Sequence, residues 1–322
     1  MQALTRVLTT ILSLSLLGGM LLHGVLVLWW GDSPWPLTLV PNWLGQFALA
    51  SLVLGFLVLM LSSKLRLAAC ALIAYGAGLL GYVAASTNWQ SGEAWLADFD
   101  ERDQESSVTA YYQNLGAGFD LAHIADRAAV LGRLKPQLFL FEEVSARRVA
   151  LMSGQLGVEP LVADYHAGGW GCAIYWLGEE PARGWVEPMA ETSLCRAEIR
   201  GATGPVHIWL AHPLPPISPA SSARQNLYLE DLAKSWRGSD AAHKIVAGDF
   251  NMSDYHPKFR ETLGGLDSQR FYSWGYYWSR FLPLTMPIDY VLATQRLEQI
   301  RLPRHGSDHH AIGFRIPGDW FR

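Results

Sequence analysis

The first 88 residues of the chain carry almost no charge. Only Arg6, Asp32, Lys64 and Arg66 are formally charged there, whereas the other 234 residues hold the remaining 50 of the 54 charged side chains. The share of charged residues in this second part is that of an ordinary soluble domain. This contrast excludes a wholly soluble protein and predicts a membrane-embedded segment followed by a globular domain.

Cysteine is also scarce. The three cysteines, Cys70, Cys172 and Cys195, are too few for a disulfide-stapled miniprotein, and an aromatic content of 12% excludes a disordered chain. Cys172 and Cys195 fall on predicted strands that we expect to be neighbours. The sequence leaves open whether these two form a disulfide or are simply buried thiols.

The globular part has no run of basic residues. After residue 88 there are 22 Lys and Arg side chains against 28 Asp and Glu side chains. This balance excludes a basic protein that binds nucleic acid mainly through charge attraction.

Three long apolar runs account for the low charge of the front segment. Each is long enough for a transmembrane helix, and they cover about 8–30, 45–62 and 67–86. Arg6 precedes the first run and Lys64 and Arg66 separate the second from the third, while the first connection has no Lys or Arg. The positive-inside rule therefore places the N-terminus in the cytoplasm and the rest of the chain after residue 88 outside it, in the periplasm of a bacterium. A cleavable signal peptide is the alternative, but the first run is too long and no small-x-small site follows it.

These observations divide the chain into three parts. We expect a transmembrane segment over 1–88, an acidic tether over 89–106 and a globular domain over 107–322. In the globular part, short β-like runs alternate with two helix-like runs, which favours an α/β sandwich. The predicted strands are 108–113, 138–142, 172–177, 194–199, 206–211, 244–247 and 288–293, and the predicted helices are 124–134 and 223–236.

Polar residues follow several of these strands directly. Asn114, Glu143, His212 and Asp249 each come at the end of an apolar run. Because strand ends can project side chains into one crevice, we expect these residues to converge. Carboxylates and amides without cysteine suit Mg²⁺ or Mn²⁺ better than zinc. Together with a histidine, such a group is equipped for the attack of water on a phosphorus ester.

The order of the polar motifs carries a family resemblance over about 107–317. The chain resembles the endonuclease/exonuclease/phosphatase superfamily, which includes deoxyribonuclease I, exonuclease III, inositol polyphosphate 5-phosphatases and neutral sphingomyelinases. The resemblance implies a four-layered α/β sandwich with two mixed sheets flanked by helices, and a metal-dependent hydrolase site. The matching motifs are Asn114-Leu115, the nine residues 136–144 that contain Glu143, Ala211-His212-Pro213, Gly248-Asp249-Phe250-Asn251, the six residues 287–292 that contain Asp289, and Gly306-Ser307-Asp308-His309.

The resemblance also implies a role for each motif residue. Glu143 is expected as the principal Mg²⁺ ligand, with Asn114 and Asp308 as further direct or water-mediated ligands. The expected catalytic residues are Asp249, which orients and deprotonates the attacking water, Asn251, which positions the water or the phosphate, a protonated His309 held by Asp289, and His212, which donates a hydrogen bond to a phosphate oxygen.

The chain departs from the family pattern at two points. Glu142 stands where most members have Gln, and we expect it to point away from the metal ligand, because neighbouring strand residues face opposite sides. The tyrosine that many nucleases place near the phosphate has no clear counterpart, and Tyr111, Tyr165 and Tyr175 remain candidates.

The family sets the reaction, phosphoester hydrolysis, but a fold does not choose the substrate. The acidic domain and the short tether favour a lipid-linked or envelope phosphodiester. A membrane-anchored nuclease remains the alternative, because Arg224, Arg260, Arg270 and Arg280 could line a groove. The aromatic segment 271–281 suits a core strand, a base-stacking platform or a membrane hairpin. An inactive membrane-anchored binding protein is less supported, since every motif residue is present, and no protein partner is indicated.

Overall fold

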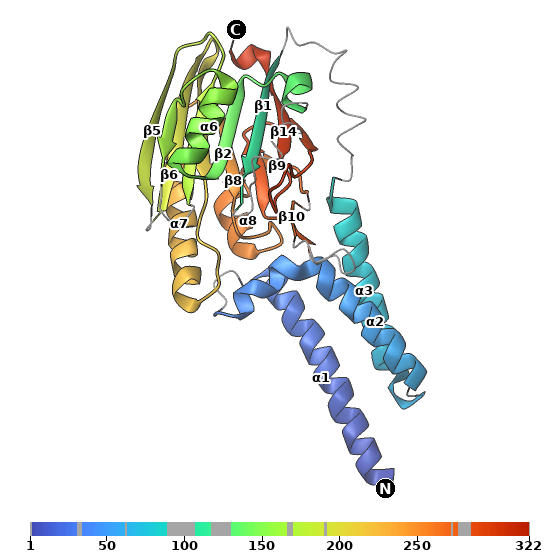
Figure 1. The fold of residues 1–322 in the computed structure, drawn as a ribbon. Coiled ribbons are helices and arrows are strands. Elements are labelled where there is room, and N and C mark those ends of the chain that lie inside the picture. The colour runs from blue at the N-terminus through green and yellow to red at the C-terminus, as the bar shows by residue number, and fades with distance from the viewer. Residues whose placement is uncertain are drawn as a thin grey trace. The chain divides into compact units, whose positions relative to one another are not determined.

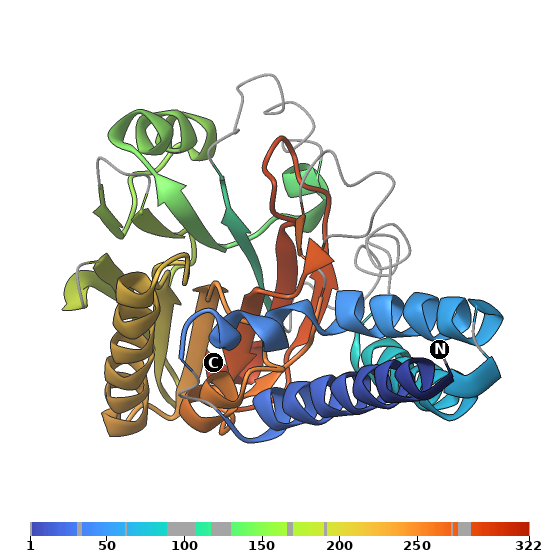
Figure 2. The ribbon, with the colours of Figure 1, turned by 90° about the horizontal axis from the view of Figure 1, so that it is seen from below.

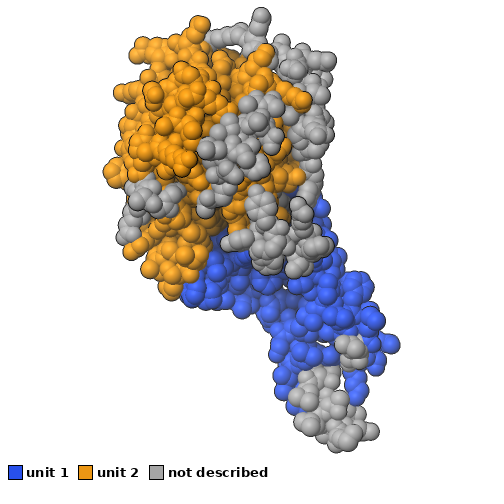
Figure 3. Space-filling model, viewed as in Figure 1, with its two compact units in different colours: residues 1–87, 253–261 blue, residues 88–252, 262–322 orange. Residues whose placement is uncertain are grey.

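The computed structural model describes residues 2–30, 34–61, 63–88, 107–116, 130–165, 170–189, 192–271, 273–275 and 285–321. The chain forms two compact units (Figure 3). The first contains Met1–Thr87 together with Ser253–Glu261, and the second contains Asn88–Met252 and Thr262–Arg322. The predicted tether, 89–106, lies outside the described residues, so the division into 1–88, 89–106 and 107–322 stays a prediction.

The first unit is built from apolar helices. They are α1 (Gln2–Leu28), the 3₁₀ helix η1 (Leu37–Trp43), α2 (Leu44–Leu61), the short 3₁₀ helix η2 (Ser63–Leu65) and α3 (Arg66–Ser86). Three of them are long and apolar enough to cross a membrane. The α2 and α3 helices pack closely, because a Cβ atom at Gly76 would lie only 2.7 Å from the Ala48 carbonyl oxygen. Such small residues let membrane helices approach one another.

The second unit contains two six-stranded mixed sheets. The strands of the first are β1 (Ser107–Asn114), β2 (Leu138–Val144), β3 (Val162–Asp164), β4 (Gly171–Trp176), β13 (Glu298–Arg301) and β14 (Ile312–Pro317), in the order β13-β14-β1-β2-β4-β3. The strands of the second are β5 (Ala182–Met189), β6 (Thr192–Gly201), β7 (Gly204–Ala211), β8 (His243–Asp249), β9 (Asp267–Ser268) and β12 (Asp289–Ala293), in the order β5-β6-β7-β8-β12-β9. The β1–β2 and β7–β8 pairs are parallel and the other pairs are antiparallel. A further small hairpin joins β10 (Trp274–Gly275) to β11 (Thr285–Met286).

The two sheets pack face to face under outer helices (Figures 1 and 2). Alternate residues of facing strands form the inner core, for example Ala110 and Tyr112 of β1 with Ile245 and Ala247 of β8. The helix α6 (Ala146–Leu156) covers the other face of the first sheet. The helix α7 (Pro219–Gly238) buries Leu229, Leu232 and Trp236, with a capping box at Ser218. The four-layered α/β sandwich implied by the resemblance is confirmed.

Several elements differ from the sequence expectation. The helix α6, the edge strand β5, the strand β14 and the short helix α8 (Pro257–Leu263) were not anticipated. In α6 the Ser145 hydroxyl accepts the Arg148 amide and Gly157 ends the helix in the left-handed conformation. Of the predicted helix 124–134, only residues 130–134 are described, and they are helical.

Candidate active site

The two parallel strand pairs bring the predicted residues to one edge of the sandwich. Asn114 of β1 pairs in register with Glu142 of β2, and β7 and β8 end beside each other before His212 and at Asp249. The antiparallel strand β12 begins at Asp289, directly opposite Asp249. The loop that carries Asp308 and His309 leads into β14, the antiparallel neighbour of β1. All eight predicted site residues are therefore delivered to the same region of the second unit.

Two of these residues have an unusual backbone. Glu143 has φ of 55° and lies at a register shift between β2 and β4, and Asn251 has φ of 50°. Left-handed backbone is uncommon for residues other than glycine and clusters at functional sites. The bulge at Glu143 re-aims its side chain toward Asn114, whose amide donates to the Glu143 carboxylate over 3.2 Å.

Oxygen donors that suit a hard cation gather around Asn114. Burial raises the pKa of Glu143, and the nearby Asp308 adds to this effect while His309 opposes it. The Asp308 Oδ1 atom is buried without a hydrogen-bond partner among the described residues, and its Oδ2 accepts from the Trp274 indole over 3.2 Å. Gly116 makes room for this carboxylate, since a Cβ atom there would lie 2.1 Å from Oδ1. Two close carboxylates, one with an orphaned oxygen, fit a divalent cation of the Mg²⁺ type.

Asp249 lies at the centre of the polar cluster and is 2% exposed. Its Oδ2 atom accepts the Asn114 amide over 3.2 Å and lies 3.7 Å from Nε2 of both His212 and His309. Its Oδ1 accepts the backbone N–H of Asn251. Burial raises the pKa of Asp249 well above its usual range and Asp289 adds to this, although His309 opposes it. A carboxylate with a raised pKa is a better base toward water.

His309 is a buried cation paired with Asp289. Its Nδ1–H donates to the Asp289 Oδ2 over 2.8 Å, and the other Asp289 oxygen lies 2.8 Å from the Tyr112 hydroxyl. Burial disfavours the charged ring, but the carboxylates of Asp289 and Asp249 outweigh it and raise the pKa of His309 to about 10. For Asp289, burial is likewise outweighed by His309, which holds the pKa of Asp289 below its usual value.

His212 has the opposite charge state. It is 3% exposed, and neither ring nitrogen has a hydrogen-bond partner among the described residues. Burial, together with the charge of His309, lowers the pKa of His212 to about 3, so the ring is neutral at physiological pH. Its ring packs against the Trp170 indole with centroids 4.9 Å apart. A neutral imidazole offers one N–H donor and one acceptor to a ligand.

Asp249, Asp289 and His309 place ligand atoms within 4.8 Å of one another, close enough to hold a metal ion. The hydrogen bonds argue for a different use, because Asp289 already binds His309 and Tyr112 with its two oxygens. A cationic imidazole also has no lone pair to give to a metal. Glu143, Asn114 and Asp308 therefore have the donor atoms better suited to hold a metal ion.

Glu142 is the site residue that sequence reasoning misjudged. It does not point away from the site: its side chain is fully buried, and its Oε2 accepts the Asp249 N–H over 2.8 Å. The same atom lies 2.9 Å from the Tyr112 hydroxyl. The Tyr112 hydroxyl is therefore shared between the carboxyl groups of Glu142 and Asp289. Burial, and then the charge of Asp249, raise the pKa of Glu142 well above its usual range, which favours the neutral form of this side chain.

Tyr112 is the tyrosine that contacts the site, and none of the three candidates does so among the described contacts. Tyr111 donates to Gln113, Tyr175 bonds Ser153 and the Val149 carbonyl, and Tyr165 is exposed. The signal was present in the sequence, because Tyr112 precedes Asn114 by two residues and shares its face of the strand. The serines Ser273 and Ser307 were also missed, and they accept the backbone N–H groups of Asp289 and His309 respectively.

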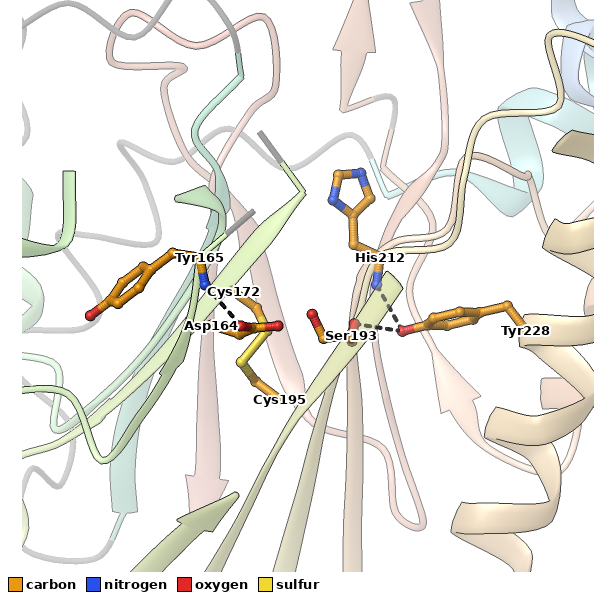
Figure 4. Close-up of a disulfide and its surroundings, with 7 residues drawn as sticks. All are labelled: Asp164, Tyr165, Cys172, Ser193, Cys195, His212 and Tyr228. Carbon is orange, nitrogen blue, oxygen red and sulfur yellow. Dashed lines mark hydrogen bonds between the residues drawn. A yellow bond between two sulfur atoms is a disulfide. The ribbon is translucent and has the colours of Figure 1, made fainter. Parts of the chain in front are cut away.

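A disulfide joins the two sheets beside the site (Figure 4). Cys172 of β4 bonds Cys195 of β6 with Cα atoms 6.0 Å apart. These strands belong to opposite sheets, so they are neighbours across the sandwich and not within one sheet. Cys172 pairs in register with Glu142, and Figure 4 shows His212 nearby, with its backbone at the Tyr228 hydroxyl and its ring projecting away from it. The disulfide therefore ties together the two strand sets that carry the site.

Comparison with known structures gives the same fold at low sequence identity. TDP2 from C. elegans has a TM-score of 0.55 and 14% identity, covering 85% of this chain and 92% of that one. TDP2 from D. rerio, solved with a single-strand DNA product, has a TM-score of 0.50 and 14% identity, covering 66% and 99%. An AP endonuclease from Archaeoglobus fulgidus has a TM-score of 0.50 and 16% identity, covering 65% and 99%.

No curated protein sequence matches the chain. The model of the Endonuclease/Exonuclease/phosphatase family, in contrast, matches residues 120–309, which is more than half of the chain and includes most of the site. Its members are metal-dependent enzymes that hydrolyse phosphoester bonds. The sandwich fold, the converging site and this match together show that the chain belongs to the endonuclease/exonuclease/phosphatase family.

Proposed function

We propose that this protein is a membrane-anchored, Mg²⁺-dependent phosphoesterase whose catalytic domain lies on the extracytoplasmic side. One observation carries the proposal most directly. The Oδ2 atom of Asp249, a buried acid with a raised pKa, lies 3.7 Å from the cationic His309 and 3.7 Å from the neutral His212, and Asn114 bonds both Asp249 and the carboxylate of Glu143. This is the equipment for hydrolysis of a phosphoester by water.

Glu143, Asn114 and Asp308 would hold the metal ion. When bound, Mg²⁺ supplies positive charge that neutralises the phosphate and makes phosphorus more open to attack. Asn114 has a second function, because its amide touches both Glu143 and Asp249. It thereby fixes the distance between the metal ligands and the base.

Asp249 would accept the proton of the attacking water at its Oδ2 atom. The Oδ1 atom is held by the Asn251 N–H, and the Asn251 side chain is fixed by the Pro213 carbonyl over 3.0 Å. The base is therefore oriented before the substrate binds. Preorganisation of this kind removes reorientation from the barrier of the reaction.

The two histidines would act on the phosphate in different ways. His309, cationic through Asp289, stabilises the negative charge that builds up on the phosphoryl oxygens in the transition state. His212, neutral and with both nitrogens free of hydrogen-bond partners among the described residues, donates one N–H to a phosphate oxygen.

The disulfide supports the extracytoplasmic location. Disulfides persist in oxidising compartments such as the periplasm. Cys172 and Cys195 are bonded to each other, whereas Cys70, inside the apolar helix α3, is free. The basic residues Lys64, in the connection after α2, and Arg66, at the start of α3, agree with an N-terminus in the cytoplasm and three crossings.

The substrate we favour is a lipid-linked or other envelope phosphodiester, since the protein is anchored by three apolar helices and its globular part is acidic. A membrane-anchored nuclease is the second candidate, because D. rerio TDP2 was solved with a DNA product and another relative in fold is an AP endonuclease. The arginine groove considered for a nuclease is less supported, because Arg260 donates hydrogen bonds to backbone carbonyls of its own unit. An inactive binding protein is disfavoured, because the predicted side chains converge.

The function is tested by incubating the full-length chain in detergent with plasmid DNA, RNA, phospholipids and inositol phosphates. The negative control is the Asp249→Asn variant, which keeps the shape of the side chain but removes the base. We expect hydrolysis of at least one phosphoester with Mg²⁺, no hydrolysis with EDTA, and none by the variant. Equal rates for the wild type and Asp249→Asn on every substrate would refute the proposal.

The location is tested separately by fusions after residue 100. Alkaline phosphatase fused there should be active and green fluorescent protein dark, because both report export of the following domain. The reverse pattern would place the enzyme in the cytosol and favour a nucleic acid or nucleotide substrate.

A further inference from the structure

One short segment of the C-terminal part of the chain belongs to the first unit, which contains the three apolar helices. Ser253–Glu261 follows the Asp249–Asn251 motif directly, yet it groups with residues 1–87 (Figure 3). Ser253 and His256 are fully buried, and Tyr255 and Phe259 are nearly so. A tether alone would need no such burial, so this segment forms a second, non-covalent attachment within the first unit.

The attachment is made by specific polar contacts with η1. The Asn42 Oδ1 atom accepts the backbone N–H of Ser253 over 2.8 Å and its hydroxyl over 3.1 Å. The Thr38 hydroxyl lies 3.0 Å from Nε2 of His256. Thr38 and Asn42 are themselves buried, at 2% and 5% exposed. Because a buried polar group that loses its partner is costly, these contacts specify one position for the segment.

A second set of contacts binds the same segment to the helices. The Arg260 guanidinium donates to the Val27 carbonyl over 2.6 Å and the Leu28 carbonyl over 3.3 Å, at the C-terminal end of α1. Carbonyls at a helix end have no partner within the helix, and the helix dipole favours a cation there. The Tyr255 ring packs against Tyr82 of α3 with centroids 5.9 Å apart. The segment therefore contacts α1, η1 and α3.

The chain passes from one unit to the other between Met252 and Ser253. Ser253 is only two residues after Asn251, whose backbone N–H holds the base Asp249. The Asn251 backbone has φ of 50°, so the turn adopts a conformation that its surroundings must maintain. A fixed point two residues away limits the motion of this turn through the covalent chain alone.

We propose that the membrane segment positions the catalytic turn 249–251 through the dock of 253–261 on Thr38 and Asn42. Thr38 and Asn42 are then positioning residues that touch neither substrate nor metal, and the membrane segment does more than anchor the enzyme. The consequence for turnover rests on the function proposed above, whereas the effect on the mobility of the turn does not.

The test uses the full chain in detergent and measures hydrogen–deuterium exchange of peptides covering 249–263. Asn42→Ala removes the acceptor of Ser253, and Asn42→Asp keeps an acceptor oxygen. Thr38→Val removes the hydroxyl with little change of shape, and Thr38→Ser keeps it. Ser86→Ala, which removes a hydroxyl bonded to carbonyls of its own helix, is the control within the same unit.

We expect Asn42→Ala and Thr38→Val to speed exchange in 249–263 by about tenfold, the factor of one lost buried hydrogen bond. Asn42→Asp, Thr38→Ser and Ser86→Ala should stay near the wild type. With bis(4-nitrophenyl) phosphate and Mg²⁺, kcat should fall while KM is unchanged, and the conservative variants should restore it. Thr38→Val is the milder change. If Asn42→Ala does not fold, the exchange of 249–263 in Thr38→Val tests the proposal.

Unchanged exchange of 249–263 in both disruptive variants would overturn the proposal, as would faster exchange confined to 253–263 with the turn and kcat unaffected. A wild type that hydrolyses no phosphoester would instead contradict the proposed function. The exchange comparison would then still decide whether the dock positions the turn.

Discussion

Two histidines beside Asp249 share nearly the same burial and the same distance from its carboxylate but differ in charge. His212, after β7, and His309, before β14, are each 3% exposed, and each lies 3.7 Å from the same carboxylate oxygen. The pKa is about 3 for His212 and about 10 for His309. The local difference is Asp289, which bonds His309 and is not bonded to His212.

The comparison shows that burial does not by itself decide the charge of a catalytic group. Burial lowers the pKa of both rings, and only a directly bonded carboxylate reverses the result. In the proposed function, one residue type thus supplies both a cation that stabilises charge and a neutral donor that binds the phosphate. Changes that remove this asymmetry should damage catalysis most.

The largest effect is expected for substitutions that remove the base or the cationic histidine. Asp249→Asn and His309→Ala should each lower kcat by at least about a hundredfold, since each removes a base or a charge that acts in the transition state. Asp289→Asn should approach the His309→Ala rate, because the ring then loses its cationic form. Rates near the wild type at saturating Mg²⁺ would show that these roles are wrongly assigned. Circular dichroism of each variant checks that it is folded.

The next largest effect concerns the proposed metal ligands. Glu143→Ala should weaken Mg²⁺ activation by about tenfold to a hundredfold, the scale of a disturbed metal site. The readout is the Mg²⁺ concentration for half-maximal rate, and the control is Arg147→Ala on the exposed start of α6. If Glu143→Ala leaves this concentration unchanged, the metal is held elsewhere, and the group of Asp249, Asp289 and His309 becomes the alternative.

Substitution of the neutral histidine, His212, should lower the rate less. His212→Asn keeps a neutral N–H donor and should lose less than about tenfold in kcat/KM, whereas His212→Ala should lose about tenfold more, the scale of one hydrogen bond to a charged group. Steady-state kinetics of the two variants measures the difference. Equal losses would mean that His212 acts as a cation or only fills space.

The smallest effect sharpens the assignment of Glu142 as a neutral acid. Glu142→Gln supplies the same neutral donor and acceptor to Tyr112 and to the Asp249 N–H, so kcat should stay within about threefold of the wild type. Glu142→Ala should leave the buried Asp249 N–H unpaired and lower stability by about 1–3 kcal/mol. Thermal unfolding and kcat check both. A Glu142→Gln variant as impaired as Glu142→Ala would show that the carboxylate charge matters.

Sequence reasoning succeeded where the chemistry is carried by the order of motifs. Asn114, Glu143, His212 and Asp249 each come at the end of an apolar run, and their residue types restrict the possible reactions. Three-dimensional context decided the rest. The backbone turn at Glu143 sets the directions of Glu142 and Glu143, and no local pattern announces it.

Other features were missed for related reasons. The edge strand β5 is half exposed and contains Gly184 and Pro188, which weaken any strand signal. The disulfide crosses between sheets, so pairing of strands within one sheet could not predict it. Arg260, considered for a substrate groove, instead contacts the end of α1, a partner 232 to 233 positions away in sequence.

The most direct test of the account is the protonation state of the two histidines. Nitrogen-15 spectra of the histidine-labelled full chain, assigned with His212→Asn and His309→Gln, report the charge of each ring as pH is changed. Because the pKa is about 10 for His309 and about 3 for His212, we predict that between about pH 5 and 9 the first stays cationic and the second neutral. In Asp289→Asn, His309 should become neutral within this range. A wild-type His309 that loses its proton below about pH 7, or a His212 that gains one above about pH 5, would contradict the account.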